Sequence, residues 1–204
     1  MGEFEGILIR LHSALQESKI DYVLVGGVTV ILRGRIRTTM DVDLIVQNDR
    51  DAFVAFLKAL KKYDFDVDFE QGMYALHEGF NLSIFDNLSP LRLDIKLAKQ
   101  HNDIQVLKKG EMYKYKNIML KIAPLEWILF GKILYIGPLE GLNDGQILEI
   151  MDVLDFISVW NKNKNSIDRE WLTQKCESES LLPTLMRILN LIEQIDEQSQ
   201  NSNV

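Results

Sequence analysis

The chain has 204 residues, 47% of them apolar, and a formal net charge of −7. This length allows one good core and a small second one, because domains commonly contain about 100 to 200 residues. The acidic balance argues against a surface that is basic throughout, so any nucleic-acid-binding groove would have to be local. The single Cys176 excludes an intramolecular disulfide, and no Cys or His spacing is typical of zinc.

The N-terminal stretch MGEFEGILIRLHSAL lacks the basic region and continuous apolar run of a secretion signal. No apolar span in the chain reaches the roughly 18 residues needed to cross a bilayer. We therefore expect a cytoplasmic protein that makes no contact with a membrane.

Residues 4–17 are predicted to form an amphipathic helix, because apolar residues recur there at helical spacing. An apolar strand is expected at residues 22–25, directly before Gly26 and Gly27. Glycine lets the backbone approach a ligand closely, and a helix starting at this point would favour phosphate at its N-terminus. The residues alone leave a tight hairpin open as well, because β-branched runs flank the glycine pair.

Asp41 and Asp43 lie in the run DVDLIV, which is β-branched enough to predict a strand. Side chains alternate along a strand, so the two carboxylates share one face while Val42 and Leu44 share the other. Carboxylates this close repel each other unless a cation lies between them, and their oxygens suit Mg²⁺ or Mn²⁺. The alternative interpretation is a solvated strand end.

Three arginines, Arg33, Arg35 and Arg37, lie between the glycines and the carboxylates. Guanidinium groups bind phosphate oxygens through paired hydrogen bonds, so this segment is a candidate for contacts with a triphosphate. The alternative is a solvated loop whose arginines pair with Asp41 or Asp43 when no metal is bound.

A helix is expected after Asn48, followed by short antiparallel strands at residues 72–77 and 80–85. Residues 91–97 then alternate cleanly between apolar and charged side chains, which predicts a strand with Asp94 on its polar face. A carboxylate in that position suits a third metal ligand or a general base. The alternative is a charge ladder that Asp94 forms with Arg92 and Lys96.

The pattern Val25-Gly26-Gly27, followed by Arg37-Thr38-Thr39-Met40 and Asp41-Val42-Asp43, resembles the signature of the nucleotidyltransferase (DNA polymerase β-like) superfamily. Within it, the pattern is similar to the branch of minimal nucleotidyltransferases and AbiEii-type toxins. The resemblance implies strand, glycine loop, helix and strand, in an α+β fold whose mixed sheet is flanked by helices. It also implies that Asp41, Asp43 and Asp94 bind metal and act in catalysis, and that Gly26, Gly27 and Arg37 contact the nucleotide.

Pro124 is typical of a helix start and marks the expected boundary to a helical C-terminal lobe. The segment Ala123-Pro124-Leu125-Glu126-Trp127-Ile128-Leu129-Phe130-Gly131-Lys132-Ile133 resembles an AbiEii segment, which implies a triphosphate contact for Lys132. The alternative is a helical lysine whose charged end extends to solvent. The AbiEii pattern then has an R-x-x-D-h-x-D-h stretch, of which only Asp152 is present, so the resemblance implies a nucleotide contact for Asp152. The alternative is an ordinary acidic stripe on a helix, formed with Glu149 and Asp155. Gln146 and Glu149 stand where the arginine and the first aspartate would fall.

We thus predict a catalytic core at residues 1–123, a helical lobe at 124–197 and a disordered tail at 198–204. The implied activity is Mg²⁺-dependent transfer of NMP from an NTP to a tRNA 3′ end or a protein hydroxyl, with a cognate toxin or antitoxin as a further partner. A rival prediction is a non-catalytic binding module that keeps the fold and acts as the partner of a toxin. Modification of a small molecule such as an antibiotic would use the same catalytic core.

Overall fold

The computed structural model describes residues 2–201, the last of them, from residue 199, by backbone only. The chain divides into two compact units. We call residues 2–29 and 37–124 the sheet unit and residues 30–36 and 125–201 the helical unit. The division after Pro124 lies next to the boundary expected from the sequence. The predicted tail begins inside the last helix, which continues to Asn201, and residues 202–204 lie outside the described residues.

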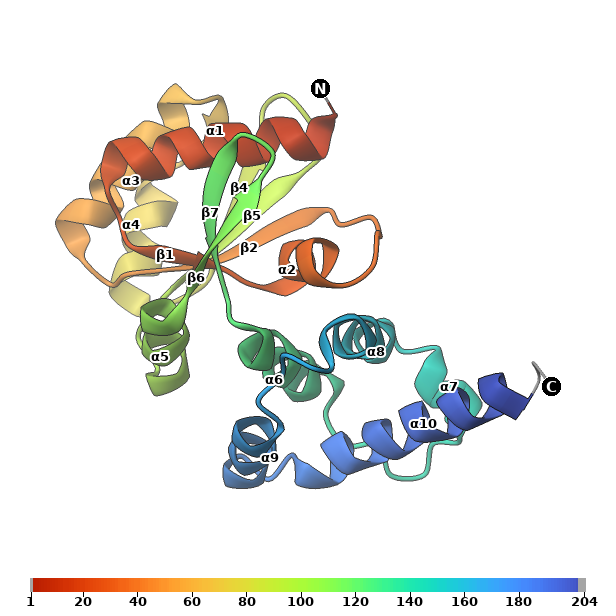
Figure 1. The fold of residues 1–204 in the computed structure, drawn as a ribbon. Coiled ribbons are helices and arrows are strands. Elements are labelled where there is room, and N and C mark those ends of the chain that lie inside the picture. The colour runs from red at the N-terminus through yellow and green to blue at the C-terminus, as the bar shows by residue number, and fades with distance from the viewer. Residues whose placement is uncertain (1, 202–204) are drawn as a thin grey trace. The chain divides into compact units, whose positions relative to one another are not determined.

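The sheet unit is a mixed α+β structure, as predicted (Figure 1). Within residues 2–201 its strands form a seven-stranded sheet in the order β3-β4-β5-β2-β1-β7-β6, in which β2 runs parallel to β5 and antiparallel to β1. The strands are β1 (Tyr22–Leu24), β2 (Asp41–Val46), β3 (Phe65–Asp66), β4 (Leu82–Asp86), β5 (Arg92–Leu97), β6 (Glu111–Tyr115) and β7 (Ile118–Ile122). The helices are α1 (Glu3–Ser18), α3 (Arg50–Lys62), α4 (Phe69–Glu78) and α5 (His101–Lys109), together with the start of α2 (Gly26–Arg33).

The core of the sheet unit follows from the alternation in its two central strands. Val42 and Leu44 of β2, and Leu93 and Ile95 of β5, are all buried on one face. The amphipathic helices α1 and α3 pack together and bury their apolar sides, which include Ile7, Leu8, Leu11, Phe53, Phe56 and Leu57. The opposite face of these two strands holds the half-buried polar residues Asp41, Asp43, Arg92, Asp94 and Lys96, together with the buried Ile45.

Residues 26–33 form the helix α2, so the strand, glycine, helix and strand order implied by the resemblance is confirmed and the hairpin alternative is wrong. Val28 and Val30 are fully buried. Their burial outweighs the weak helix propensity of β-branched residues, which amounts to a few tenths of a kcal/mol per residue, about 0.7 at most.

The predicted strand at residues 72–77 is wrong, because this segment lies inside α4. Asp68 caps the helix by accepting hydrogen bonds from the backbone N–H groups of Glu70 and Gln71. Gly79 ends it with a φ of 84°, in the left-handed conformation that glycine adopts without strain. These caps lie outside the segment that seemed to alternate. The next predicted strand is present as β4.

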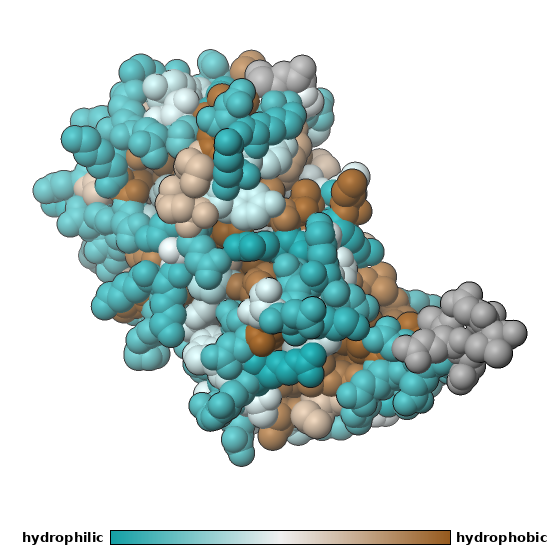
Figure 2. Space-filling view, viewed as in Figure 1, coloured by the Kyte–Doolittle hydropathy of each residue, from teal (hydrophilic) through white to brown (hydrophobic). Residues whose placement is uncertain are grey.

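The helical unit contains α6 (Leu125–Ile136), α7 (Asp144–Leu148), α8 (Met151–Asn163), α9 (Arg169–Ser178) and α10 (Leu182–Asn201). α6 packs against α8, α9 and α10, as expected for a helix that is apolar on nearly all sides. Most of the surface seen in Figure 2 is hydrophilic, with apolar residues in smaller patches. No helix in the described part of the chain is long and apolar enough to cross a membrane.

Candidate active site

The acids predicted to bind metal lie together on the polar face of the sheet. In the parallel pairing of β2 and β5, Asp43 is directly opposite Asp94, and Asp41 is directly opposite Arg92. Neighbouring strands lie about 4.8 Å apart, and residues in register point to the same side. All four side chains are half-buried, in contrast to the buried residues between them. The structure therefore brings Asp94 next to the Asp41 and Asp43 pair.

Gly26 lies against the carboxylate of Asp43. A Cβ placed on Gly26 would be 2.0 Å from Oδ2 of Asp43, and the φ of Gly26 is +61°. A side chain at this position would meet both a steric clash and backbone strain. Gly26 is therefore required by its contact with the acid.

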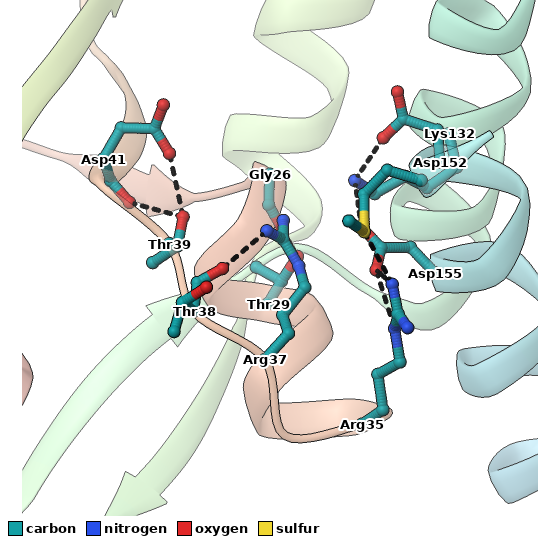
Figure 3. A network of polar contacts seen from close by, with 11 residues as sticks. Gly26, Thr29, Arg35, Arg37, Thr38, Thr39, Asp41, Lys132, Asp152 and Asp155 are labelled. Atoms are coloured by element: carbon teal, nitrogen blue, oxygen red, sulfur yellow. Dashed lines mark hydrogen bonds and ion pairs between the residues drawn. The ribbon is translucent and has the colours of Figure 1, made fainter. Parts of the chain in front are cut away.

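The absence of a side chain at Gly27 leaves room for a cation, as the absence of one at Gly26 leaves room for a carboxylate. A Cβ on Gly27 would lie 2.5 Å from Nη2 of Arg37 and 2.7 Å from Oγ1 of Thr39. The Arg37 guanidinium therefore lies against the first turn of α2, and it also donates to the Thr38 carbonyl at 3.0 Å (Figure 3). A helix start and a guanidinium both attract phosphate, so Gly26, Gly27 and Arg37 together provide a surface suited to an anion.

Two hydroxyl groups orient the acids. Thr39 donates to Oδ1 of Asp41 at 2.9 Å (Figure 3), and Ser83 of β4 donates to Oδ1 of Asp94 at 2.6 Å. Thr39 belongs to the R-x-T-x-D pattern, so the sequence contained a signal for it. Ser83 had none, because its contact depends on the register that sets it opposite Asp94.

Arg92 connects two of the acids. Its Nε lies 3.1 Å from both carboxylate oxygens of Asp94, and its Nη2 lies 3.3 Å from Oδ2 of Asp41. Hydrogen bonding to Asp94 raises the pKa of Arg92, and the charges of Asp94, Asp41 and Asp43 act in the same direction. The charge ladder considered from the sequence is present in part, since Lys96 pairs instead with Asp103 of α5 at 2.8 Å.

Asp41, Asp43 and Asp94 carry carboxylate oxygens, the ligand type that Mg²⁺ and Mn²⁺ prefer. Within residues 2–201 no three acidic, His or Cys side chains already surround a common point as metal ligands do. The Arg92 guanidinium donates to Oδ2 of Asp94 and to Oδ2 of Asp41.

Lys132 and Asp152 lie in the helical unit and contact each other. Nζ of Lys132 is 2.7 Å from Oδ1 of Asp152 and 2.8 Å from Oδ2 of Asp155 (Figure 3). The Lys132 side chain is 9% exposed and that of Asp155 is 0% exposed. Lys132 is thus the buried counter-ion of two acids, and a phosphate contact would require it to exchange these partners.

Arg35 also belongs to this buried cluster. Its guanidinium lies 3.1 Å from Oδ1 of Asp155, and Gly34 packs closely against Ser158 and Val159 of the same helix. The sequence interpretations of Arg35, a triphosphate contact or a partner of Asp41 or Asp43, did not foresee this pairing within the helical unit.

The positions that depart from the family pattern have structural roles in α7. Gln146 completes a capping box with Asn143 at the start of this short helix, and Glu149 is its C-cap. The helix α8, which contains Asp152, begins at Met151, and its N-cap Ile150 separates it from α7. The arginine and first aspartate of the pattern are therefore replaced by residues that cap a helix.

These observations agree with a comparison against protein families. A family described as "nucleotidyltransferase of unknown function (DUF6036)" matches residues 7–115, more than half of the 204-residue chain. The chain belongs to this nucleotidyltransferase family. The match includes the glycine pair and all three acids. The AbiEii-type branch is not the family that matched.

Solved structures show the same nucleotidyltransferase fold. An antigenic nucleotidyltransferase-like protein from Paracoccidioides brasiliensis matches with a TM-score of 0.56 at 18% identity, over 95% of this chain and 94% of that one. ANT(2″)-Ia, in complex with adenylyl-2″-tobramycin, matches with a TM-score of 0.53 at 12% identity, over 90% of this chain and 98% of that one. At these identities the likeness shows the fold alone. A comparison with curated proteins found no match.

Proposed function

We propose that the protein transfers NMP from an NTP to a hydroxyl group and depends on Mg²⁺ or Mn²⁺. The observation that carries this proposal is the register of β2 and β5, which sets Asp43 opposite Asp94 on the polar face where Asp41 also lies. The contact of Gly26 with Asp43 adds the start of α2 to the same place. Acids for a metal and N–H groups for phosphate are the two parts that this chemistry needs.

Asp41, Asp43 and Asp94 would hold the metal. When bound, it would polarise the α-phosphate and stabilise the departing pyrophosphate. The backbone at Gly26 and Gly27 and the Arg37 guanidinium would orient the β- and γ-phosphates.

Asp94 would also help to take the proton of the acceptor hydroxyl. The acceptor oxygen would form a bond to the α-phosphorus as the bond to pyrophosphate breaks.

The acceptor we propose is a tRNA 3′ end or a protein hydroxyl, in a toxin–antitoxin pair of the AbiEii type. This follows from the resemblance of the R-x-T-x-D pattern and of the segment around Lys132. The structure of ANT(2″)-Ia holds an adenylylated small molecule, so a small-molecule acceptor is an outcome to be tested alongside.

Labelled transfer tests the proposal. The protein is incubated with Mg²⁺ and each α-³²P-labelled NTP, together with total RNA, cell lysate or a panel of hydroxylated antibiotics. We expect label in one fraction, lost in Asp41→Asn and Asp43→Asn but retained in Asp66→Asn. Asp66 is an exposed acid on β3 of the same sheet and provides the matched control. Full transfer by either site variant would reject the proposed roles of the acids.

A non-catalytic binding module is the second candidate. The AbiEii pattern has an arginine and an aspartate where this chain has Gln146 and Glu149. Because these two residues cap α7, the replacement favours the binding module. Calorimetry with ATP, GTP, CTP and UTP in the presence of Mg²⁺ separates the two candidates. Absence of heat with all four would favour the binding module, whereas saturable binding of one of them supports the enzyme.

A further inference from the structure

Arg92 is a cation on the acid-bearing face of β2 and β5. It lies directly opposite Asp41 and precedes Asp94 by two residues, so all three side chains project from the same side of the sheet. The Arg92 side chain is 39% exposed, and it reaches the acids from the open side of the face rather than from within the core. Its guanidinium can therefore move without disturbing the packed layer beneath.

The guanidinium uses specific oxygens. Nε contacts both oxygens of Asp94, and Nη2 contacts Oδ2 of Asp41. Oδ1 of Asp41 is bonded to Thr39, and Oδ1 of Asp94 also accepts from Ser83. The hydroxyls hold Oδ1 of each acid, whereas Arg92 contacts Oδ2 of each and shares Oδ1 of Asp94 with Ser83. The Oδ2 atoms, which neither hydroxyl contacts, are the ones that a divalent ion would use.

Charge explains why an arginine is held at this position. Three carboxylates on adjacent positions repel each other, and one guanidinium offsets part of their charge. Arginine does not lose its proton in proteins. Arg92 therefore cannot make way for a metal by becoming neutral. It must move.

We propose that Arg92 is an exchangeable internal cation, which occupies the acids of the metal-free protein and gives up Asp41 and Asp94 when a divalent ion binds. The proposal rests on the proposed function, since it assumes that these acids are the metal ligands. Arg92 would thus lower the affinity for the metal alone and position Asp94 until the metal arrives. In its displaced position the guanidinium remains on the same face and is available to phosphate oxygens.

Mn²⁺ binding without nucleotide tests this directly. Free Mn²⁺ is measured by electron paramagnetic resonance, and this measurement requires no enzymatic turnover. We compare the wild type with Arg92→Met, which keeps the length of the side chain but not its charge, and with Arg92→Lys, which keeps the charge but not the paired hydrogen bonds. Lys96→Met is the matched control, because Lys96 is on the same strand but pairs with Asp103.

We expect Arg92→Met to bind Mn²⁺ about tenfold more tightly, since a competing charge-assisted interaction is removed. Arg92→Lys should lie in between, and Lys96→Met should match the wild type. Thermal unfolding adds a second measurement: Arg92→Met should have a lower Tm than the wild type without metal and recover it with Mn²⁺.

Two results overturn the proposal and are distinguishable. If Asp94→Asn abolishes Mn²⁺ binding while Arg92→Met binds no more tightly than the wild type, Arg92 does not compete and the metal site stands. If neither the wild type nor any Arg92 variant binds Mn²⁺, the proposed metal site and this inference both fail. If Arg92→Met does not fold, Arg92→Lys decides, since equal affinity in that variant and the wild type also rejects the exchange.

Discussion

Gly26 and Asp43 are in such close contact that no side chain fits between them, since a Cβ at residue 26 would lie 2.0 Å from Oδ2 of Asp43. The glycine pair and the aspartate pair are separated in the sequence, yet each is needed because of the other. The same applies to Gly27, whose missing side chain leaves room for Arg37 and Thr39. The glycine and aspartate residues of the sequence motif therefore contact one another within a single site.

Gly26→Ala is expected to abolish nucleotide transfer and to destabilise the protein by about 1–3 kcal/mol, because φ is positive and the Asp43 carboxylate must move. Gly131→Ala is the control, since Gly131 lies in α6 with nothing within 4 Å of its Cβ position. The control should be neutral or stabilising by roughly 0.5–1 kcal/mol, as alanine is the better helix former. Denaturant unfolding and the labelling assay measure both effects. An active Gly26→Ala variant would contradict the role assigned to this contact.

Ser83→Ala is expected to lower kcat about tenfold, because Asp94 loses the hydroxyl that holds its Oδ1 at 2.6 Å. The Kd for the NTP should stay unchanged, since Ser83 lies on the side of Asp94 away from β2. Ser83→Thr should restore most of the rate. Ser13→Ala is a neutral comparison, as Ser13 bonds within α1 to the carbonyl of Ile9. A parallel rise in Kd would indicate a structural role instead.

Asp155→Ala should destabilise the protein by about 3–5 kcal/mol, because removing one member of a buried ion cluster leaves the others uncompensated. Asp155 is fully buried and pairs with both Lys132 and Arg35. The surface pair of Lys175 and Glu179 provides the control, and Glu179→Ala should cost about 0.5 kcal/mol or less. The free energy of unfolding measures the difference. If Asp155→Ala lowers the free energy of unfolding as little as Glu179→Ala does, the cluster around Asp155 is not a buried ion cluster.

Cys176 should make the protein less stable at alkaline pH. Burial raises the pKa of its thiol to about 11, while the charge of Lys175 acts weakly the other way. In the unfolded chain a thiol has a pKa of about 8.5, so above that pH the unfolded state loses a proton that the folded state retains. The buried neutral thiol therefore leaves the free energy of unfolding unaffected by pH below about 8.5, and that free energy falls as the pH rises from about 8.5 toward 11.

The measurement is the free energy of unfolding of the wild type and of Cys176→Ala between pH 7 and 10. The wild type should lose stability more steeply above pH 8.5 than the variant does. Iodoacetamide provides an independent check, since a fully buried thiol should be alkylated only after unfolding. Rapid alkylation of the folded protein at pH 8 would contradict the expectation.

The sequence predicted those parts of the fold that depend on local periodicity. The helix at 4–17 and the strand at 91–97 follow from apolar spacing, and the structure contains them as α1 and β5. The helix expected after Pro124 follows from the preference of proline for a helix start, and it is present as α6. The alternation in segment 72–77 favours a strand, whereas the caps that bound the helix α4, Asp68 and Gly79, lie outside that segment. Burial at Val28 and Val30 explains why the hairpin interpretation also failed.

By itself, the sequence determined the family, the two-residue spacing that puts Asp41 and Asp43 on one face, and the identity of the acids available for a metal. The tertiary structure decided which other groups contact these acids: Arg92 through the register of β2 with β5, and Ser83 through that of β4 with β5. The same register sets Asp94, which the resemblance had implied, directly opposite Asp43. The tertiary structure also decided that Lys132 and Arg35 share the buried Asp155. The physical reason is that alternation along a strand is a local property, whereas strand register and buried charge pairing depend on residues far apart in the chain.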